Sequence, residues 1–259
     1  MDAFVEAFAA LRLPLHALVN CAGVCMPAFS RTPDGFEARV RTPARSNAVP
    51  DAHSLAQVQL GTNHVGPSYR TLCLLPALRA AAAPGAPPGR VVFIASNAPH
   101  FAPPLAALLR ARDVGGAALT QTGFREYACS KAYGVLFARA LAARLAAETP
   151  PAPLLVSVAH PGFVATPIQS KATGLASALV RLIAQLFALS PARGAHSTLY
   201  AATAPAVRSG EGFGPSDYNR GLTMPWAPRG DIFDAPDAAD VLFDETLRVL
   251  ADKGRAVSI

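Results

Sequence analysis

The 259-residue sequence contains little charge. Asp, Glu, Lys and Arg together make up only 15% of the chain, whereas 51% of its residues are hydrophobic. Such a composition is not that of an intrinsically disordered protein and predicts a folded globular one. The net charge is +6, and the basic residues are scattered singly through the chain. Because no basic run forms an electrostatic footprint, the sequence indicates no nucleic-acid partner.

Cysteine and histidine are also scarce. The four cysteines form no C-x-x-C pair, which excludes a disulfide scaffold and favours reduced thiols in a cytoplasmic setting. The six histidines show no ligand pair at helical or finger spacing, so a metal centre is not expected. A serine hydrolase is not expected either, because the sequence has no G-x-S-x-G segment.

Long hydrophobic runs are absent. The longest apolar stretch, residues 175–189, carries Arg181 and Gln185 and is shorter than a bilayer crossing requires. The N-terminus is acidic and amphipathic and does not resemble a secretory signal. We therefore expect no transmembrane segment. Residues 174–190 form an amphipathic pattern that favours core packing or a substrate lid, with peripheral membrane contact as the alternative.

Short apolar runs alternate with helical periodicity along the chain. Residues 15–19, 90–95 and 154–158 are apolar throughout, which is typical of parallel strands buried on both faces. The alternation predicts an α/β fold, a doubly wound parallel sheet of Rossmann-like type, in a single domain over residues 1–259. Helices are expected near residues 4–11, 65–78, 105–110, 127–148, 174–190, 190–203 and 237–252.

Residues 39–54 interrupt this pattern. The stretch contains three arginines, Asn47 and two prolines, and it has no apolar periodicity. It has nothing that would pack it onto a core. We predict a flexible surface insertion at 39–54 that a protease would cut first.

Tyr127 and Lys131 lie four residues apart on a predicted helix, so their side chains share one face. A tyrosine with its usual pKa of about 10 is a poor acid-base catalyst at neutral pH, but an adjacent cation stabilises the phenolate and lowers that pKa. Lys131 would be that cation. Taken alone, the spacing more often reflects two residues that merely share a solvated helix face.

Polar or small residues follow each predicted strand. Ser96 ends the second strand, where its hydroxyl would either polarise a carbonyl oxygen or cap a turn. Asn20-Cys21-Ala22-Gly23 ends the first strand and residues 160–166 end the third. Ligands of open α/β sheets bind beyond the carboxyl ends of the strands. The three strand ends therefore predict one crevice.

These segments, together with Asn63, resemble the motifs of the short-chain dehydrogenase/reductase family in the order in which that family carries them. The resemblance covers nearly the whole chain and is closest to the retinol-dehydrogenase-like and WW-domain-oxidoreductase-like branch. The segments are Asn20-Cys21-Ala22-Gly23 for N-N-A-G, Asn63 for the helix asparagine, Ser96 for the catalytic serine, Tyr127-Ala128-Cys129-Ser130-Lys131 for Y-x-x-x-K, and Pro161-Gly162-Phe163-Val164-Ala165-Thr166 for P-G-x-V-x-T.

The resemblance implies an oxidoreductase that transfers a hydride between NAD or NADP and a lipophilic alcohol or carbonyl compound. It makes Tyr127 the acid/base. Lys131 would lower the Tyr127 pKa and hold the nicotinamide ribose, Ser96 would orient the substrate carbonyl, and Asn63 would support a proton relay. The residues that would line the cofactor are Asn20, Ala22, Gly23, Tyr127 and Lys131, with Pro161, Gly162, Val164 and Thr166 at its nicotinamide end.

The family's glycine-rich T-G-x-x-x-G-x-G turn, whose helix N-terminus holds the cofactor pyrophosphate, is not in the sequence. The cluster at residues 210–214 runs into Pro215 and cannot open such a helix. We therefore expect an N-terminally truncated, incomplete domain that binds NAD or NADP weakly. Residues 15–20 would then form an exposed sheet edge that invites a homo-oligomer. The alternative function is a cofactor-deficient remnant or a binding or interaction protein without catalysis, or the product of a truncated gene model.

Overall fold

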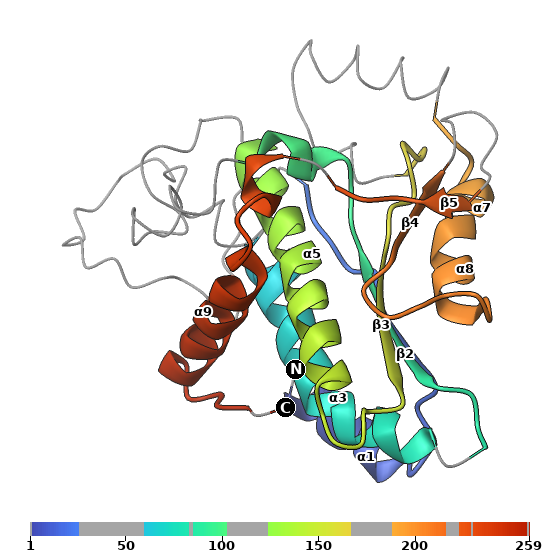
Figure 1. The fold of residues 1–259 in the computed structure, drawn as a ribbon, viewed down its shortest axis with the longest axis vertical. Helices are drawn as coiled ribbons and strands as arrows, with labels where there is room; N and C mark the ends of the chain where they lie inside the picture. Colours follow the sequence, from blue (N-terminus) through green and yellow to red (C-terminus); the bar gives the residue numbers. More distant parts are fainter. Residues whose placement is uncertain are drawn as a thin grey trace.

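The computed structural model describes residues 2–25, 60–82, 85–102, 124–166, 188–215, 223–228, 230–257 and 259. The predicted insertion at 39–54, the predicted helix at 105–110 and most of that at 174–190 lie outside these residues. Figure 1 shows the elements in chain order, which are α1 (Asp2–Ala10), β1 (Ala17–Asn20), η1 (Gly61–Val65), α3 (Gly66–Ala81), β2 (Gly89–Ile94), η2 (Ala98–Phe101), α5 (Phe124–Ala146), β3 (Leu154–Ala159), α7 (Pro191–Gly194), α8 (His196–Thr203), β4 (Gly212–Pro215), β5 (Thr223–Pro225), η4 (Asp231–Phe233) and α9 (Ala238–Asp252).

The strands form one sheet in the order β1-β2-β3-β4-β5. The first four are parallel, whereas β5 pairs antiparallel with β4. In the register of the centre, Val91 lies opposite Leu18 on one side and Val156 on the other. This arrangement confirms the predicted α/β fold and its three apolar strands. Two short strands, β4 and β5, were not predicted.

Helices cover both faces of the sheet, as a doubly wound fold requires. In Figure 1, α3, α5 and α9 lie on one side of the strands and α8 lies on the other. Side chains of a strand alternate between faces, so Val91 and Phe93 join the core beneath α3 and α5, while Val92 packs with Ala201 of α8. The larger core includes the stacked rings of Phe137 and Phe243, whose centroids are 4.8 Å apart.

The predicted helix at 190–203 is divided in two. Ser190 caps its start, because its hydroxyl accepts a hydrogen bond from the Arg193 amide at 3.4 Å, and Pro191 follows as the first helical residue. The chain forms α7 and α8, separated by Ala195, instead of one helix. Gly194 packs closely at this point, because an added Cβ would lie 2.4 Å from a Val164 side-chain carbon.

β1 lies at one end of the sheet. Among the described strands it pairs with β2 alone, and Ala17 at its start is exposed. The expected sheet edge at this strand is therefore present. Its role in self-association stays a prediction, as does the truncation.

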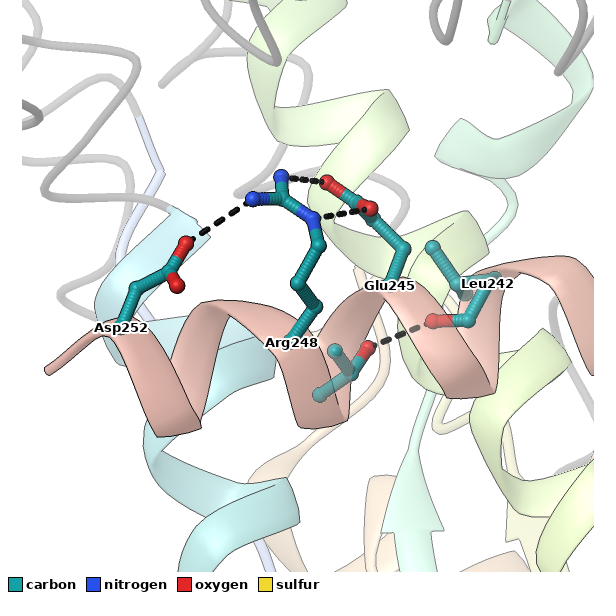
Figure 2. A network of polar contacts seen from close by, with 5 residues as sticks. Leu242, Glu245, Arg248 and Asp252 are labelled. Carbon is teal, nitrogen blue, oxygen red and sulfur yellow. Dashed lines mark hydrogen bonds and ion pairs between the residues drawn. The ribbon is translucent and has the colours of Figure 1, made fainter. Parts of the chain in front are cut away.

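α9 closes the face of α5 with an apolar inner side and a charged outer side. Figure 2 shows Arg248 between Glu245 and Asp252 on the outer side, with its Nε 2.8 Å from Glu245 and its Nη1 2.8 Å from Asp252. Such exposed ion pairs contribute at most about 1 kcal/mol each. The apolar side, with Phe243 fully buried, therefore holds the helix in place. Within the described residues, no helix has the length and apolar character needed to cross a membrane.

His64, which is 3% exposed, connects η1 to α9 inside the core. Its Nε2 lies 2.9 Å from the Thr246 hydroxyl, which itself donates to the carbonyl of Leu242 at 2.8 Å. Because the only hydrogen of that hydroxyl is directed to Leu242, Nε2 of His64 is the donor. Burial lowers the pKa of His64 to about 3.

His64 should make the fold sensitive to acid. Its pKa in the folded state lies below the unfolded value of about 6.5. The unfolded state therefore binds more protons between these values, and stability is lost as the pH falls below about 6.5. We expect His64 to remove about 2 kcal/mol from the free energy of unfolding between pH 7 and 5.

Urea unfolding of the wild type and His64→Gln at both pH values measures this contribution. The pH dependence should become shallower in His64→Gln and stay unchanged in the control His16→Gln, because His16 is exposed. An equal pH dependence in all three proteins would contradict the assignment.

Candidate active site

The four predicted catalytic residues lie on three separate parts of the fold. Tyr127 and Lys131 belong to α5, Asn63 belongs to the π-helix η1, and Ser96 follows the end of β2. Parallel strands place their carboxyl ends at one edge of the sheet. Hydrogen bonds at this edge, described below, bring the four residues together with the loop that follows β1.

Lys131 is anchored to the sheet. It is 7% exposed, and its Nζ donates a hydrogen bond to the carbonyl oxygen of Ile94 at 2.9 Å. The same Nζ lies 5.9 Å from the centroid of the Tyr127 ring. Burial lowers the pKa of Lys131 to about 8, and the nearby Cys21 and Cys25 oppose the shift. The lysine is therefore still mostly charged at neutral pH.

The pKa of Tyr127 is higher than its position beside Lys131 predicts. Burial raises its pKa to about 12, Cys25 raises it further, and a hydrogen bond with Ser96 opposes the shift. The expectation of a lowered Tyr127 pKa is wrong for the present geometry, because the net shift is upward. The physical reason is that desolvation of the phenolate dominates, and the lysine ammonium donates to Ile94.

Ser96 has two partners. Its hydroxyl accepts a hydrogen bond from the Ala98 amide at 3.1 Å, which caps the turn after β2. It also hydrogen-bonds with Tyr127. The turn-cap interpretation of this serine is therefore confirmed, and the turn holds the hydroxyl beside the phenol. Its role toward a carbonyl oxygen stays a prediction.

Asn63 connects the β1 loop to α5. Its Oδ1 accepts from the Val24 amide at 2.8 Å, and its Nδ2 donates to the Val24 carbonyl at 2.9 Å and to the Ser130 hydroxyl at 2.9 Å. Asn63 lies in the π-helical turn Gly61–Val65, and such turns occur often at functional sites. The side chain is 6% exposed, so these three bonds fix it.

The loop after β1 packs closely on this cluster. A Cβ added to Gly23 would lie 3.3 Å from both Asn63 Oδ1 and Lys131 Nζ. A small pocket opens beside it, and its lining includes Asn20, Ala22, Asn63, Ile94 and Lys131. Three predicted cofactor residues, at positions 20, 22 and 23, thus lie next to two predicted catalytic ones.

The side chain of Asn20 is engaged by α3. Its Nδ2 donates to the Thr71 hydroxyl at 2.9 Å, and its Oδ1 accepts from Arg70 at 2.6 Å. Asn20 is 3% exposed. Its amide therefore anchors the end of β1 to the helix layer, and it lines the pocket from an already bonded position.

The end of β3 is built differently. Gly162 has a φ of +82°, a left-handed conformation that favours glycine, and Val164 forms an isolated bridge with Leu189. Neither these residues nor Pro161 and Thr166 line the pocket beside Lys131. The structure thus places this segment after β3 as predicted, and its role at the nicotinamide end stays a prediction.

Three further contacts of the cluster were not found from the sequence. Ser130 contacts Asn63 through its side chain, and its position three residues after Tyr127 was the available signal. Ile94 and Val24 act through backbone groups, which every residue type carries. No sequence pattern could have identified them. Among the described residues, no group of three or more potential metal ligands forms.

The chain has close relatives among curated dehydrogenases. It is 34% identical to polyprenol dehydrogenase of Mus musculus over 204 residues. This aligned region covers 79% of the present chain and 52% of the relative. It is 31% identical over 225 residues to retinol dehydrogenase 12 of Homo sapiens, covering 87% and 60%. A third relative, short-chain dehydrogenase/reductase pkfC of Emericella nidulans, is 34% identical over 206 residues, covering 78% and 56%. The chain thus spans little more than half the length of these relatives.

Solved structures share the fold. The 3-ketoacyl-(acyl-carrier-protein) reductase of Brucella melitensis, complexed with NADH, has a TM-score of 0.54 at 20% identity and matches 86% of this chain and 75% of that one. The RhlG/NADP complex of Pseudomonas aeruginosa has a TM-score of 0.53 at 20% identity, matching 85% and 72%. No protein-family model matches the chain.

The chain has the Rossmann-like architecture of these solved structures, and its curated relatives are dehydrogenases. The chain belongs to the short-chain dehydrogenase/reductase family.

Close packing at Gly23 should make this glycine sensitive to substitution. We expect Gly23→Ala to lower the free energy of unfolding by about 1–2 kcal/mol, because its Cβ would press on Asn63 and Lys131. Gly134 of α5 is the matched control, since a Cβ there meets nothing within 4 Å. Gly134→Ala should raise stability by about 0.5–1 kcal/mol through helix propensity. Urea unfolding of both variants measures the contrast, and equal effects would refute the packing argument.

Proposed function

We propose that the chain catalyses hydride transfer between a nicotinamide cofactor and a lipophilic alcohol or carbonyl compound, with Tyr127 as the acid/base. The observation that carries the proposal is the cluster at the end of β2. There Tyr127 hydrogen-bonds with Ser96, and Lys131 lies beside the phenol. Asn63 reaches the same turn of α5 through Ser130. A partly buried phenol with two polar neighbours is suited to moving one proton.

The protonation states favour carbonyl reduction. With a pKa of about 12, Tyr127 carries its proton at neutral pH, and it can donate that proton to a carbonyl oxygen held by Ser96. The phenolate left behind is stabilised by the Lys131 ammonium, which is charged below pH 8. Alcohol oxidation is the reverse proton transfer.

The residues present fit the nicotinamide side of a cofactor. Gly23 allows the loop backbone to approach the cluster closely, and the Lys131 ammonium has two hydrogens left for ribose hydroxyls after its bond to Ile94. NAD or NADP would supply or accept the hydride. The same residues do not hold a pyrophosphate, and the 259 residues contain no glycine-rich turn that would.

The names of two relatives support a lipophilic substrate. Polyprenol dehydrogenase and retinol dehydrogenase 12 are named after isoprenoid alcohols. We extend this substrate class to the present chain as part of the proposal.

A second candidate is a binding protein without catalysis. The glycine cluster at residues 210–214 is the nearest to a phosphate-binding turn, and it contributes to strand β4 instead of opening a helix. Without a pyrophosphate anchor, cofactor binding would be weak. A chain that binds lipophilic alcohols but turns none over would fit this candidate.

Kinetics of the Tyr127→Phe variant should distinguish the proposed oxidoreductase from a binding protein without catalysis. We expect this variant to lower the kcat of carbonyl reduction by about 10²–10⁴-fold, because it removes the proton donor and leaves the aromatic ring. Tyr133→Phe is the control, since Tyr133 lies on the same helix but packs against His64 in the core. Steady-state kinetics with a long-chain aldehyde and NADPH or NADH measures both variants. Near-normal kcat in Tyr127→Phe would remove Tyr127 from the mechanism, and a wild type without turnover would favour the binding protein.

The pH dependence of kcat/KM should reflect the protonation of Lys131. Burial lowers its pKa to about 8, so the ammonium loses its proton as the pH rises through that value, while Tyr127 stays protonated. We expect kcat/KM for carbonyl reduction to be level from pH 6 to 7.5 and to fall about tenfold for each pH unit well above 8. A profile that stays level to pH 10 would contradict the role of the lysine charge.

A further inference from the structure

Ser130 links the helix α5 to Asn63 by a buried side-chain hydrogen bond. Its side chain is 1% exposed. The hydroxyl donates to the carbonyl oxygen of Tyr127 at 2.8 Å and accepts from Asn63 Nδ2 at 2.9 Å. The first bond directs the hydroxyl hydrogen back along the helix, so only a lone pair faces Asn63.

This direction of the hydroxyl, together with the two peptide groups of Val24, selects the orientation of the Asn63 amide. Both Nδ2 hydrogens are used, one by the Val24 carbonyl and one by Ser130, while Oδ1 accepts from the Val24 amide. In the reversed orientation Oδ1 would face the Val24 carbonyl and the Ser130 lone pair. Because both of these are acceptors, that orientation is repulsive.

The orientation of the amide in turn holds the β1 loop. The side chain of Asn63 forms hydrogen bonds with the backbone amide and the backbone carbonyl of Val24. The residue before Val24, Gly23, lies close to Asn63 and Lys131. A tilt of the Asn63 amide therefore moves the loop relative to the lysine. The loop residue Ala22 lines the pocket together with Asn63 and Lys131.

We propose that Ser130 is a positioning residue that fixes the Asn63 amide and thereby holds the β1 loop against the catalytic helix. Ser130 touches no reacting atom and acts through Asn63. The inference rests on the proposed function for its effect on catalysis. Its structural part, which is the link from Ser130 to Val24, does not depend on activity.

Hydrogen exchange of the Val24 amide, followed by NMR, tests the structural part. The Val24 amide donates to Asn63 Oδ1, and we expect Ser130→Ala to accelerate its exchange about tenfold, as the loss of one buried hydrogen bond would. The control is Ser68→Ala, which removes another buried helical hydroxyl, one that contacts His64 at 3.5 Å. Ser68→Ala should leave Val24 exchange unchanged. Unchanged exchange in Ser130→Ala, or equal acceleration in both variants, would overturn the proposal.

A double-mutant cycle tests whether Ser130 acts through Asn63. If it does, Ser130→Ala should accelerate Val24 exchange in the wild-type background and have no further effect in an Asn63→Ala background. Equal effects in both backgrounds would mean that Ser130 stabilises the region independently, and the positioning role would be rejected.

Kinetics of the same variants tests the catalytic consequence. We expect Ser130→Ala to raise the KM for the nicotinamide cofactor at least as strongly as it lowers kcat, because the loop moves while Tyr127 and Lys131 remain. A loss confined to kcat would overturn this part. A wild type without turnover would count against the proposed function, whereas the exchange measurements would still decide the role of Ser130.

Discussion

The parallel pairing of β1, β2 and β3 is the constraint on which the rest of the structure depends. Its register brings Leu18, Val91 and Val156 side by side, and it sets the three strand ends at one edge. Once the strands are fixed, the carbonyl of Ile94 lies within reach of Lys131, and the β1 loop lies within reach of Asn63. The helices that carry Asn63, Tyr127 and Lys131 pack on the apolar face of the same sheet.

Burial shapes the chemistry of the site more than charge pairing does. It raises the pKa of Tyr127 and lowers that of Lys131, so both shifts favour the neutral form of each group. Desolvation acts on both in the same sense, because a low-dielectric surrounding penalises any charge. The phenol of Tyr127 therefore holds its proton more tightly than a free tyrosine does. The ammonium of Lys131 gives up its proton at a lower pH than that of a free lysine.

The elements with a clear apolar pattern could be predicted correctly from the sequence alone. The strands at 90–95 and 154–158 and the helix at 127–148 appear as β2, β3 and α5, and the four-residue spacing placed Tyr127 beside Lys131. β4 was missed because its glycines resemble a turn. They are needed there for a tertiary reason, since a Cβ on Gly212 would lie 2.3 Å from the backbone oxygen of Trp226. The raised pKa of Tyr127 also depends on burial, which no local pattern reports.

The framework of the site is held largely by main-chain atoms. Asn63 grips the peptide groups of Val24, and Lys131 binds the carbonyl of Ile94. Because every amino acid except proline offers the same peptide groups, the side chains at positions 24 and 94 are not required by these bonds. Evolution and protein engineering can therefore vary these two side chains to reshape the surroundings of the site. The hydrogen bonds that position Lys131 and the β1 loop would stay the same in such variants.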